Sequence, residues 1–173
     1  MSKPHTHACS VAKFLNLFGD AWTWMVVREA FYGATRFTEI QRNTGIARNL
    51  LSERLRKLVD AEILEREDVG ERGTRYAYRL TEKGRSLLPV LVAMVQWSNR
   101  ELHAPGTEPV LLVDRTSGRE LADLVPRDAD GEALAWGRVA ARPGPGADQP
   151  ARDRINAASQ LVASRLAPSE AGD

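Results

Sequence analysis

The amino-acid sequence predicts an α+β fold that is mostly helical, with one β-hairpin, a long helix after it, and a small β-rich C-terminal appendage. Three observations support this fold class. Apolar residues recur at helical spacing through residues 8–60, with glycines at the breaks. Two strand-like runs, 63–69 and 74–80, flank a glycine-containing turn. The run 81–103 follows and is apolar on nearly every side in its middle.

The first three helices are predicted from apolar spacing and from the residues at their ends. A helix over residues 8–19 ends at Gly19, and a second over 21–31 carries Trp22 on its apolar face. A short third helix begins after Thr35, which we expect to be its N-cap, and ends at Gly45.

The fourth helix, residues 47–60, has two different faces. Leu51, Leu55 and Leu58 recur at i, i+4 and i+7 and form an apolar stripe. The other side is polar and basic, with Arg48, Asn49, Ser52, Glu53, Arg56 and Lys57. In the second strand of the hairpin, alternation predicts that Tyr76, Tyr78 and Leu80 face inward and that Arg75, Ala77 and Arg79 face outward.

This order of helices, tight turn, basic helix, hairpin and long helix is that of a winged helix-turn-helix. A helix fits the major groove of DNA, and the hairpin, or wing, reaches neighbouring phosphates or the minor groove. We expect Arg48, Asn49 and Ser52 to contact bases or backbone near the start of the groove helix. Further DNA contacts are expected from the basic residues around it and on the wing, which are Arg36, Arg54, Arg56, Lys57, Arg72 and Arg75.

Charge and composition restrict the other classes of function. Residues 1–103 contain 16 Lys and Arg against 12 Asp and Glu, whereas the remainder contains 8 against 11, so the basic surplus lies with the predicted DNA-binding part. Gly-x-Ser-x-Gly, a Walker loop and a metal-binding His pair are all missing, so we expect neither an enzyme nor a cofactor. The single cysteine, Cys9, excludes an intrachain disulfide, and no run of about 18 apolar residues exists. We therefore expect a cytoplasmic protein without a membrane segment or bound metal.

The chain after His103 is expected to be organised differently. Residues 1–103 would form the DNA-binding and dimerisation domain, and a Pro- and Gly-rich linker begins at 104. Short apolar runs within 104–148 predict small β-hairpins, and 149–173 is expected to be a C-terminal helix or tail.

Residues 9–103 resemble the HxlR-type regulators, which are relatives of the MarR group. The resemblance rests on residues spread along this segment: Cys9, Gly19, Trp22, Arg28, Gly33, the run Arg36 to Ile40, Gly45, Ile46, the run Leu51 to Leu58, the run Tyr78 to Gly84, and Trp97. It implies a homodimer joined through the first and last helices, a groove helix at 47–60 and a wing at 63–80. Such a two-fold protein would bind a pseudo-palindromic operator in duplex DNA.

The sequence departs from the family pattern in three places. Glu62 stands where the family usually has glycine after the groove helix, and the wing tip lacks the proline that is often found there. Some members carry a zinc-ribbon-like cysteine pattern in a C-terminal extension. The matching positions here are Ser117, Arg127 and Asp130, which cannot supply the thiolates that zinc needs.

The resulting hypothesis is a sequence-specific DNA-binding transcription regulator, a repressor relieved by a small molecule or by thiol modification. The alternative is a winged-helix module that binds a partner protein and no specific DNA site. Cys9 is either a buried apolar residue or a reactive, redox-sensing thiol, as in some members of the family. Trp22 and Trp97 either pack in the core and dimer interface or form the walls of an effector pocket.

Overall fold

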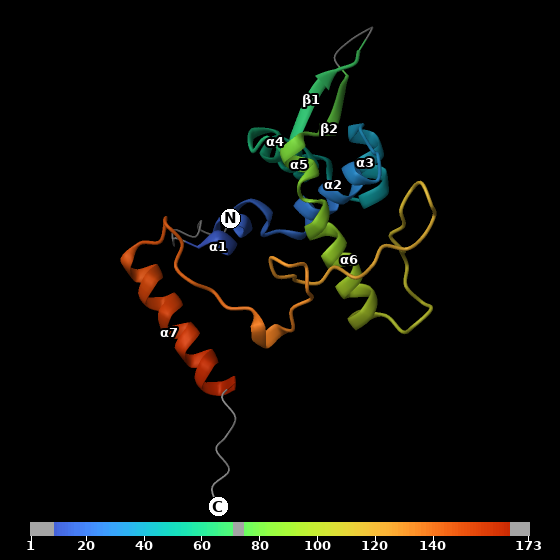
Figure 1. The fold of residues 1–173 in the computed structure, drawn as a ribbon. Coiled ribbons are helices and arrows are strands. Elements are labelled where there is room, and N and C mark those ends of the chain that lie inside the picture. Colours follow the sequence, from blue (N-terminus) through green and yellow to red (C-terminus); the bar gives the residue numbers. More distant parts are fainter. Residues whose placement is uncertain (1–8, 71–74, 167–173) are drawn as a thin grey trace, which may run out of the picture. The chain divides into compact units, whose positions relative to one another are not determined.

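The computed structural model describes residues 9–70 and 75–166 (Figure 1). The chain divides into two compact units, and each is described by itself. One unit is Leu17–Leu124, and the other contains the residues up to Asn16 and those from Val125 onward.

The unit Leu17–Leu124 contains the predicted elements in the predicted order. They are α2 (Ala21–Phe31), α3 (Phe37–Thr44), α4 (Arg48–Asp60), β1 (Leu64–Asp68), β2 (Tyr76–Leu80), α5 (Glu82–Arg85) and α6 (Leu88–Leu102). Its core is formed mainly by side chains of α2, α3, α4 and β1, including Val26, Val27, Ile40, Ile46, Leu51, Leu55, Leu58 and Leu64. The leucine stripe predicted for the fourth helix is therefore confirmed as buried. This winged helix-turn-helix is the predicted fold class.

Local capping interactions determine where α2 and α3 begin. The Asp20 carboxylate accepts hydrogen bonds from the backbone N–H of Thr23 at 2.9 Å and from its hydroxyl at 2.6 Å. Thr35 was expected to cap α3, but Arg36 is the N-cap residue. The reason is Glu39, whose carboxylate accepts from the N–H groups of both Thr35 and Arg36, at 3.0 and 2.9 Å. Gly45 ends α3 with φ of 71°, as its position predicted.

The wing is a two-stranded antiparallel hairpin in which Leu64 pairs with Leu80 and Asp68 with Tyr76. The predicted alternation was wrong on this strand, because Ala77 is buried and Tyr76 is 37% exposed. Two backbone contacts with the start of α3 explain the difference. Ala77 forms a backbone bridge with Arg36, and the Tyr78 N–H donates to the Thr35 carbonyl at 2.7 Å. The short side chain of Ala77 lets β2 approach the start of α3, and this contact sets the inward face.

The predicted single helix over 81–103 was also wrong, because it is divided into α5 and α6. Thr81 caps α5 as expected, accepting from the Gly84 N–H at 3.0 Å. Ser86 and Leu87 separate the two helices, and Pro89 follows in the first turn of α6. Proline has no N–H to donate to a carbonyl one turn earlier, and its ring clashes with that carbonyl, so a continuous helix breaks here.

The connection from α4 to β1 is tied to the start of α5. Glu62 has a left-handed backbone, with φ of 59°, at the position where the family usually has glycine. The Glu62 carbonyl accepts from the Thr81 hydroxyl at 2.6 Å, and Lys83 donates to the Ala61 carbonyl at 2.8 Å. These bonds offset a backbone conformation that costs a non-glycine residue about 1 kcal/mol.

The segment 110–124 packs on α6 through two amide side chains. Gln96 donates to the Ala122 carbonyl at 2.9 Å and accepts from the Leu124 N–H at 2.8 Å. Asn99 donates to the Val110 carbonyl at 2.7 Å. Part of the surface of α6 is thus covered by the chain itself.

The other unit contains most of α1 (Ser10–Phe18), an irregular segment from Val125, a 3-10 turn η1 (Trp136–Arg138) and α7 (Gln149–Leu166). The small hairpins expected in 104–148 are reduced to two isolated bridges, Val113 with Glu120 in the unit Leu17–Leu124 and Arg127 with Ala133 in this unit. Each bridge closes a tight turn that contains a glycine at positive φ, Gly118 or Gly131. The helix expected after 149 is present as α7. Among the described residues, no helix is long and apolar enough to span a membrane.

Candidate nucleic-acid interface

The α4 helix presents a continuous polar face opposite its buried leucines. Arg48, Asn49, Ser52 and Arg56 are all exposed, whereas Leu51 and Leu55 are buried. Arg48 and Asn49 lie in the first turn, where free backbone N–H groups and the helix dipole favour anions. The face therefore combines exposed hydrogen-bond donors at its start with a further exposed cation, Arg56, two turns after Arg48.

Arg54 has a different position from the one that the sequence predicted. Its guanidinium contacts the Asp20 carboxylate at 2.8 Å and the Glu53 carboxylate at 2.9 Å, and its side chain is only 16% exposed. Lys57 lies 3.9 Å from the same Asp20. These ion pairs raise the pKa of Arg54 despite its partial burial, which opposes the shift. Arg54 thus joins α4 to the start of α2 instead of facing outward.

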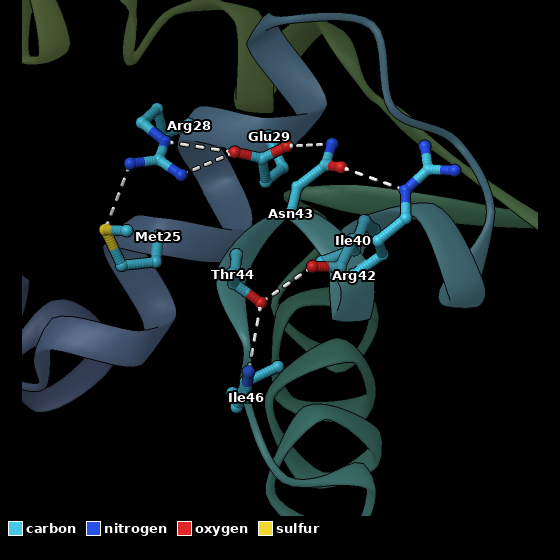
Figure 2. A network of polar contacts seen from close by, with 8 residues as sticks. All are labelled: Met25, Arg28, Glu29, Ile40, Arg42, Asn43, Thr44 and Ile46. Carbon is cyan, nitrogen blue, oxygen red and sulfur yellow. Dashed lines mark hydrogen bonds and ion pairs between the residues drawn. The ribbon is translucent and has the colours of Figure 1, made fainter.

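A buried carboxylate holds the helix-turn-helix together (Figure 2). Glu29 of α2 is 4% exposed, and it accepts from Arg28 at 2.6 and 3.1 Å and from the Asn43 amide at 2.7 Å. The Arg28 guanidinium balances the charge of this buried carboxylate. Because Asn43 lies near the end of α3, its bond to Glu29 connects α3 with α2. Nearby, the Thr44 hydroxyl donates to the Ile40 carbonyl at 2.7 Å and accepts from the Ile46 N–H at 3.3 Å. Hydrogen bonds therefore fix the turn before α4, through Asn43 to α2 and through Thr44 to α3 and Ile46.

A cleft of about 530 Å³ lies between the wing and the starts of α3 and α4. Its wall includes Arg36, Arg48 and Arg75, which the sequence assigned separately to DNA binding. The Arg48 guanidinium lies over the Phe37 ring, 5.4 Å from its centre, and this contact restrains it. The structure thus brings three of the predicted residues together at one end of the interface. Arg72 lies outside the described residues.

Aromatic side chains of this interface were not identified from the sequence as functional. Phe37, Tyr76 and Tyr78 line the same cleft, and Arg66 lies over the Tyr76 ring, 4.2 Å from its centre. The sequence pattern that bears on the two tyrosines is the alternation along the strand, and it predicted that both face the core. The exposure of Tyr76 follows from the packing of Ala77 against α3, which no local pattern reveals.

The two candidate effector residues lie on surfaces of the unit Leu17–Leu124. Trp22 is 38% exposed on α2, and Trp97 is 52% exposed on α6. Val90, Met94 and Trp97 follow one another at i, i+4 and i+7 and form an exposed apolar stripe. Neither Trp22 nor Trp97 is among the described residues that line the three clefts of this unit.

Cys9 immediately precedes α1 and is partly exposed. Backbone N–H groups of Ala12 and Val11 lower the pKa of its thiol, and Arg154 of α7 adds a smaller effect in the same direction. The position of the cysteine at a helix N-terminus therefore favours the thiolate more than in a free cysteine, and burial opposes this effect.

Comparison with known proteins identifies the family. The model of the HxlR-like helix-turn-helix family matches residues 17–105. An uncharacterised HTH-type transcriptional regulator of Mycobacterium tuberculosis is 38% identical over 137 residues, which cover 79% of this chain and 87% of the relative. The regulator YodB of Bacillus subtilis is 34% identical over 86 residues, 49% of this chain and 77% of its own.

Solved structures agree with these relatives. The crystal structure of PA1607, a proposed transcription factor, is 40% identical, with a TM-score of 0.74, and covers 80% of this chain and 97% of its own. The redox regulator HypR in its reduced form is 30% identical, with a TM-score of 0.50, and covers 54% of this chain and 96% of its own. The chain has the fold of these regulators, belongs to a non-enzymatic class, and is a member of the HxlR-like helix-turn-helix family of DNA-binding transcription regulators.

Proposed function

We propose that the protein is a homodimeric repressor that binds a pseudo-palindromic operator and is released by an inducer. The observation that carries the DNA contact is the exposed face of α4, where Arg48, Asn49 and Ser52 precede Arg56. Arg48 and Asn49 would form hydrogen bonds with base edges, because both lie in the first turn of the groove helix. Arg56 would contact phosphates, together with Arg36 and Arg75 at the wing.

Dimerisation would use the apolar stripe of α6. Val90, Met94 and Trp97 remain exposed although the segment 110–124 already covers another part of this helix. An exposed apolar stripe on a helix is unfavourable in a monomer and is typical of a subunit interface. Two copies joined there would present two α4 helices to successive turns of the major groove. Light scattering at micromolar concentration should give the mass of a dimer, and a monomer would contradict the proposal.

Thiol modification at Cys9 is one proposed route of induction. The lowered pKa of the thiol favours the reactive thiolate, and HypR, a protein of similar structure, is a redox regulator. Because the chain has only one cysteine, a disulfide within the dimer would have to join two subunits. A coupling of about 1.4 kcal/mol would change operator affinity tenfold.

A small molecule bound near Trp22 or Trp97 is the second proposed route. Operator binding by wild type and Cys9→Ser, each with and without diamide, distinguishes the two. Under the thiol route, only wild type loses affinity with diamide. If neither protein responds, the inducer is a small molecule that does not react with the thiol.

The proposal is tested first by mobility-shift titration with genomic fragments from around the gene itself, against random duplexes of equal length. Specific binding should exceed non-specific binding by about a thousandfold or more at physiological salt. Equal affinity for all fragments would instead support the alternative, a winged-helix module that binds a partner protein.

A further inference from the structure

We infer that the cleft between the wing and the starts of α3 and α4 binds a small planar aromatic carboxylate, and that this ligand and DNA exclude each other. The inference rests on the proposed function only for its second part, because the cleft and its side chains are described without reference to DNA. Three arginines and three aromatic residues meet here: Arg36, Arg48 and Arg75 with Phe37, Tyr76 and Tyr78.

The positive charge of this cleft is not balanced by its own wall. No aspartate or glutamate is among the described lining residues, and none of the three arginines forms a side-chain ion pair within the described part of the chain. Two neighbouring carboxylates bind backbone N–H groups instead of these guanidiniums, and of the two Glu39 interacts electrostatically with Arg36. Glu39 accepts from backbone N–H groups at the start of α3, and Asp68 accepts from the N–H groups of Gly70 and Arg75. The cleft therefore favours an anion.

The aromatic side chains determine the shape of that anion. Phe37 already stacks on the Arg48 guanidinium, and Tyr76 and Tyr78 of the wing line the same cleft. Aromatic side chains in the wall favour a flat ligand, because a flat ring can stack on them. Burial raises the pKa of Tyr78, so its phenol stays protonated at neutral pH and can donate a hydrogen bond.

Size separates a small acid from a bare inorganic anion. The volume of about 530 Å³ lies in the range of small-molecule sites, about 300–1,000 Å³, and greatly exceeds the volume of a phosphate ion. A carboxylate can form two parallel hydrogen bonds with one guanidinium, and its ring can fill the space beside the aromatic side chains. A two-ring acid such as 2-naphthoate combines the charge and the flat shape.

Competition with DNA follows from shared groups. Arg36, Arg48 and Arg75 are the same cations that would contact the operator, and a bound carboxylate occupies and neutralises them. The apparent Kd for operator DNA should therefore rise by the factor 1 + [L]/Kd, about elevenfold when the ligand is present at ten times its own Kd.

The test is calorimetric titration of the full-length protein with 2-naphthoate, and with methyl 2-naphthoate, cyclohexanecarboxylate and inorganic phosphate as comparisons. Naphthoate should bind with one site per chain and at least about tenfold more tightly than any comparison compound. Arg75→Gln and Tyr76→Ala should each weaken it about tenfold. Arg79→Gln is the matched control, because Arg79 lies exposed on the same strand but outside the cleft, and it should bind like wild type.

Several results would overturn the inference, and they differ from a failure of the proposed function. Phosphate binding as tight as naphthoate would mean a plain anion site, and equal loss in the Arg79 control would mean a general charge effect. No naphthoate binding by a protein that still binds its operator overturns the inference alone. Naphthoate binding that leaves operator affinity unchanged overturns the competition. Naphthoate binding by a protein without any operator supports the ligand site and counts against the DNA function.

Discussion

The ion pair between Asp20 and Arg54 makes a quantitative prediction about α4. Asp20→Asn should keep the N-cap of α2, because asparagine caps helices as well as aspartate does and its amide oxygen can still accept from the Thr23 N–H. It should remove the negative charge that faces Arg54 and, at a longer distance, Lys57. The two side chains are 30% and 16% exposed. An exposed pair contributes about 0.2–1 kcal/mol, and breaking a buried pair costs about 3–5 kcal/mol. We therefore expect a loss of about 1–2 kcal/mol of unfolding free energy.

A double-mutant cycle isolates this interaction. Asp20→Asn, Arg54→Gln and the double variant are compared by urea denaturation followed by circular dichroism, and the coupling free energy should be about 1 kcal/mol. Burial opposes the shift, but the bonds from Thr23 and Arg54 hold the pKa of Asp20 below its ordinary value. The stabilisation is therefore present above the ordinary carboxyl pKa and is lost as the pH falls through the lower folded value. In Asp20→Asn this acid-dependent loss should be absent.

Arg54→Gln, compared with Arg56→Ala, also tests whether the Arg54 side chain faces α2 or the DNA. A residue that contacts a phosphate contributes about 1 to the slope of log affinity against log salt. Arg54→Gln should leave this slope unchanged, whereas Arg56→Ala should lower it by about 1. An equal drop in both variants, or a coupling near zero in the cycle, would refute the assignment of Arg54 to the contact between α2 and α4.

Three further predictions concern other parts of the molecule. Gly84→Ala should destabilise the protein by about 1–3 kcal/mol, because a Cβ there would lie 2.2 Å from the Ile63 carbonyl oxygen; Gly144→Ala, in open space, should stay within about 0.5 kcal/mol in the same denaturation assay. Arg48→Ala should cost about 1–3 kcal/mol on the operator and much less on random DNA, as measured by mobility shift; equal losses would mean that Arg48 reads no base. The N–H groups of Arg36 and Thr35 lower the pKa of Glu39, so its carboxyl should titrate below the ordinary range by NMR, and titration at the ordinary pKa would contradict the capping geometry.

Much of the DNA-binding unit could be predicted from the sequence because its signals are local. The leucines of α4 recur at helical spacing, and Gly45 marks the turn before that helix. Both patterns follow from the geometry of one helix and one turn, without knowledge of what packs against them. The exposed residues at the start of α4 follow from the same periodicity.

The features that were not predicted depend on contacts between distant segments. The basic composition of this segment predicted a DNA contact for Arg54, but Asp20, 34 residues earlier, decides where its guanidinium lies. Tyr76 is exposed because Ala77 lies against the start of α3. The break at Leu87 could have been found locally, since Pro89 signals it. The irregular extension was overestimated as β-rich because short apolar runs also occur in segments that only cover another element, as 110–124 covers α6.

The division of α4 into separate faces has a consequence for how such a protein can evolve. Leu51, Leu55 and Leu58 maintain the core, and Arg54 attaches the helix to α2. The exposed positions 48, 49, 52 and 56 take part in neither task. Substitutions there are therefore nearly neutral for folding, and a duplicated gene could acquire a new target sequence without passing through an unstable intermediate. Laboratory randomisation of these four positions should accordingly give mostly folded variants, from which new operator preferences can be selected.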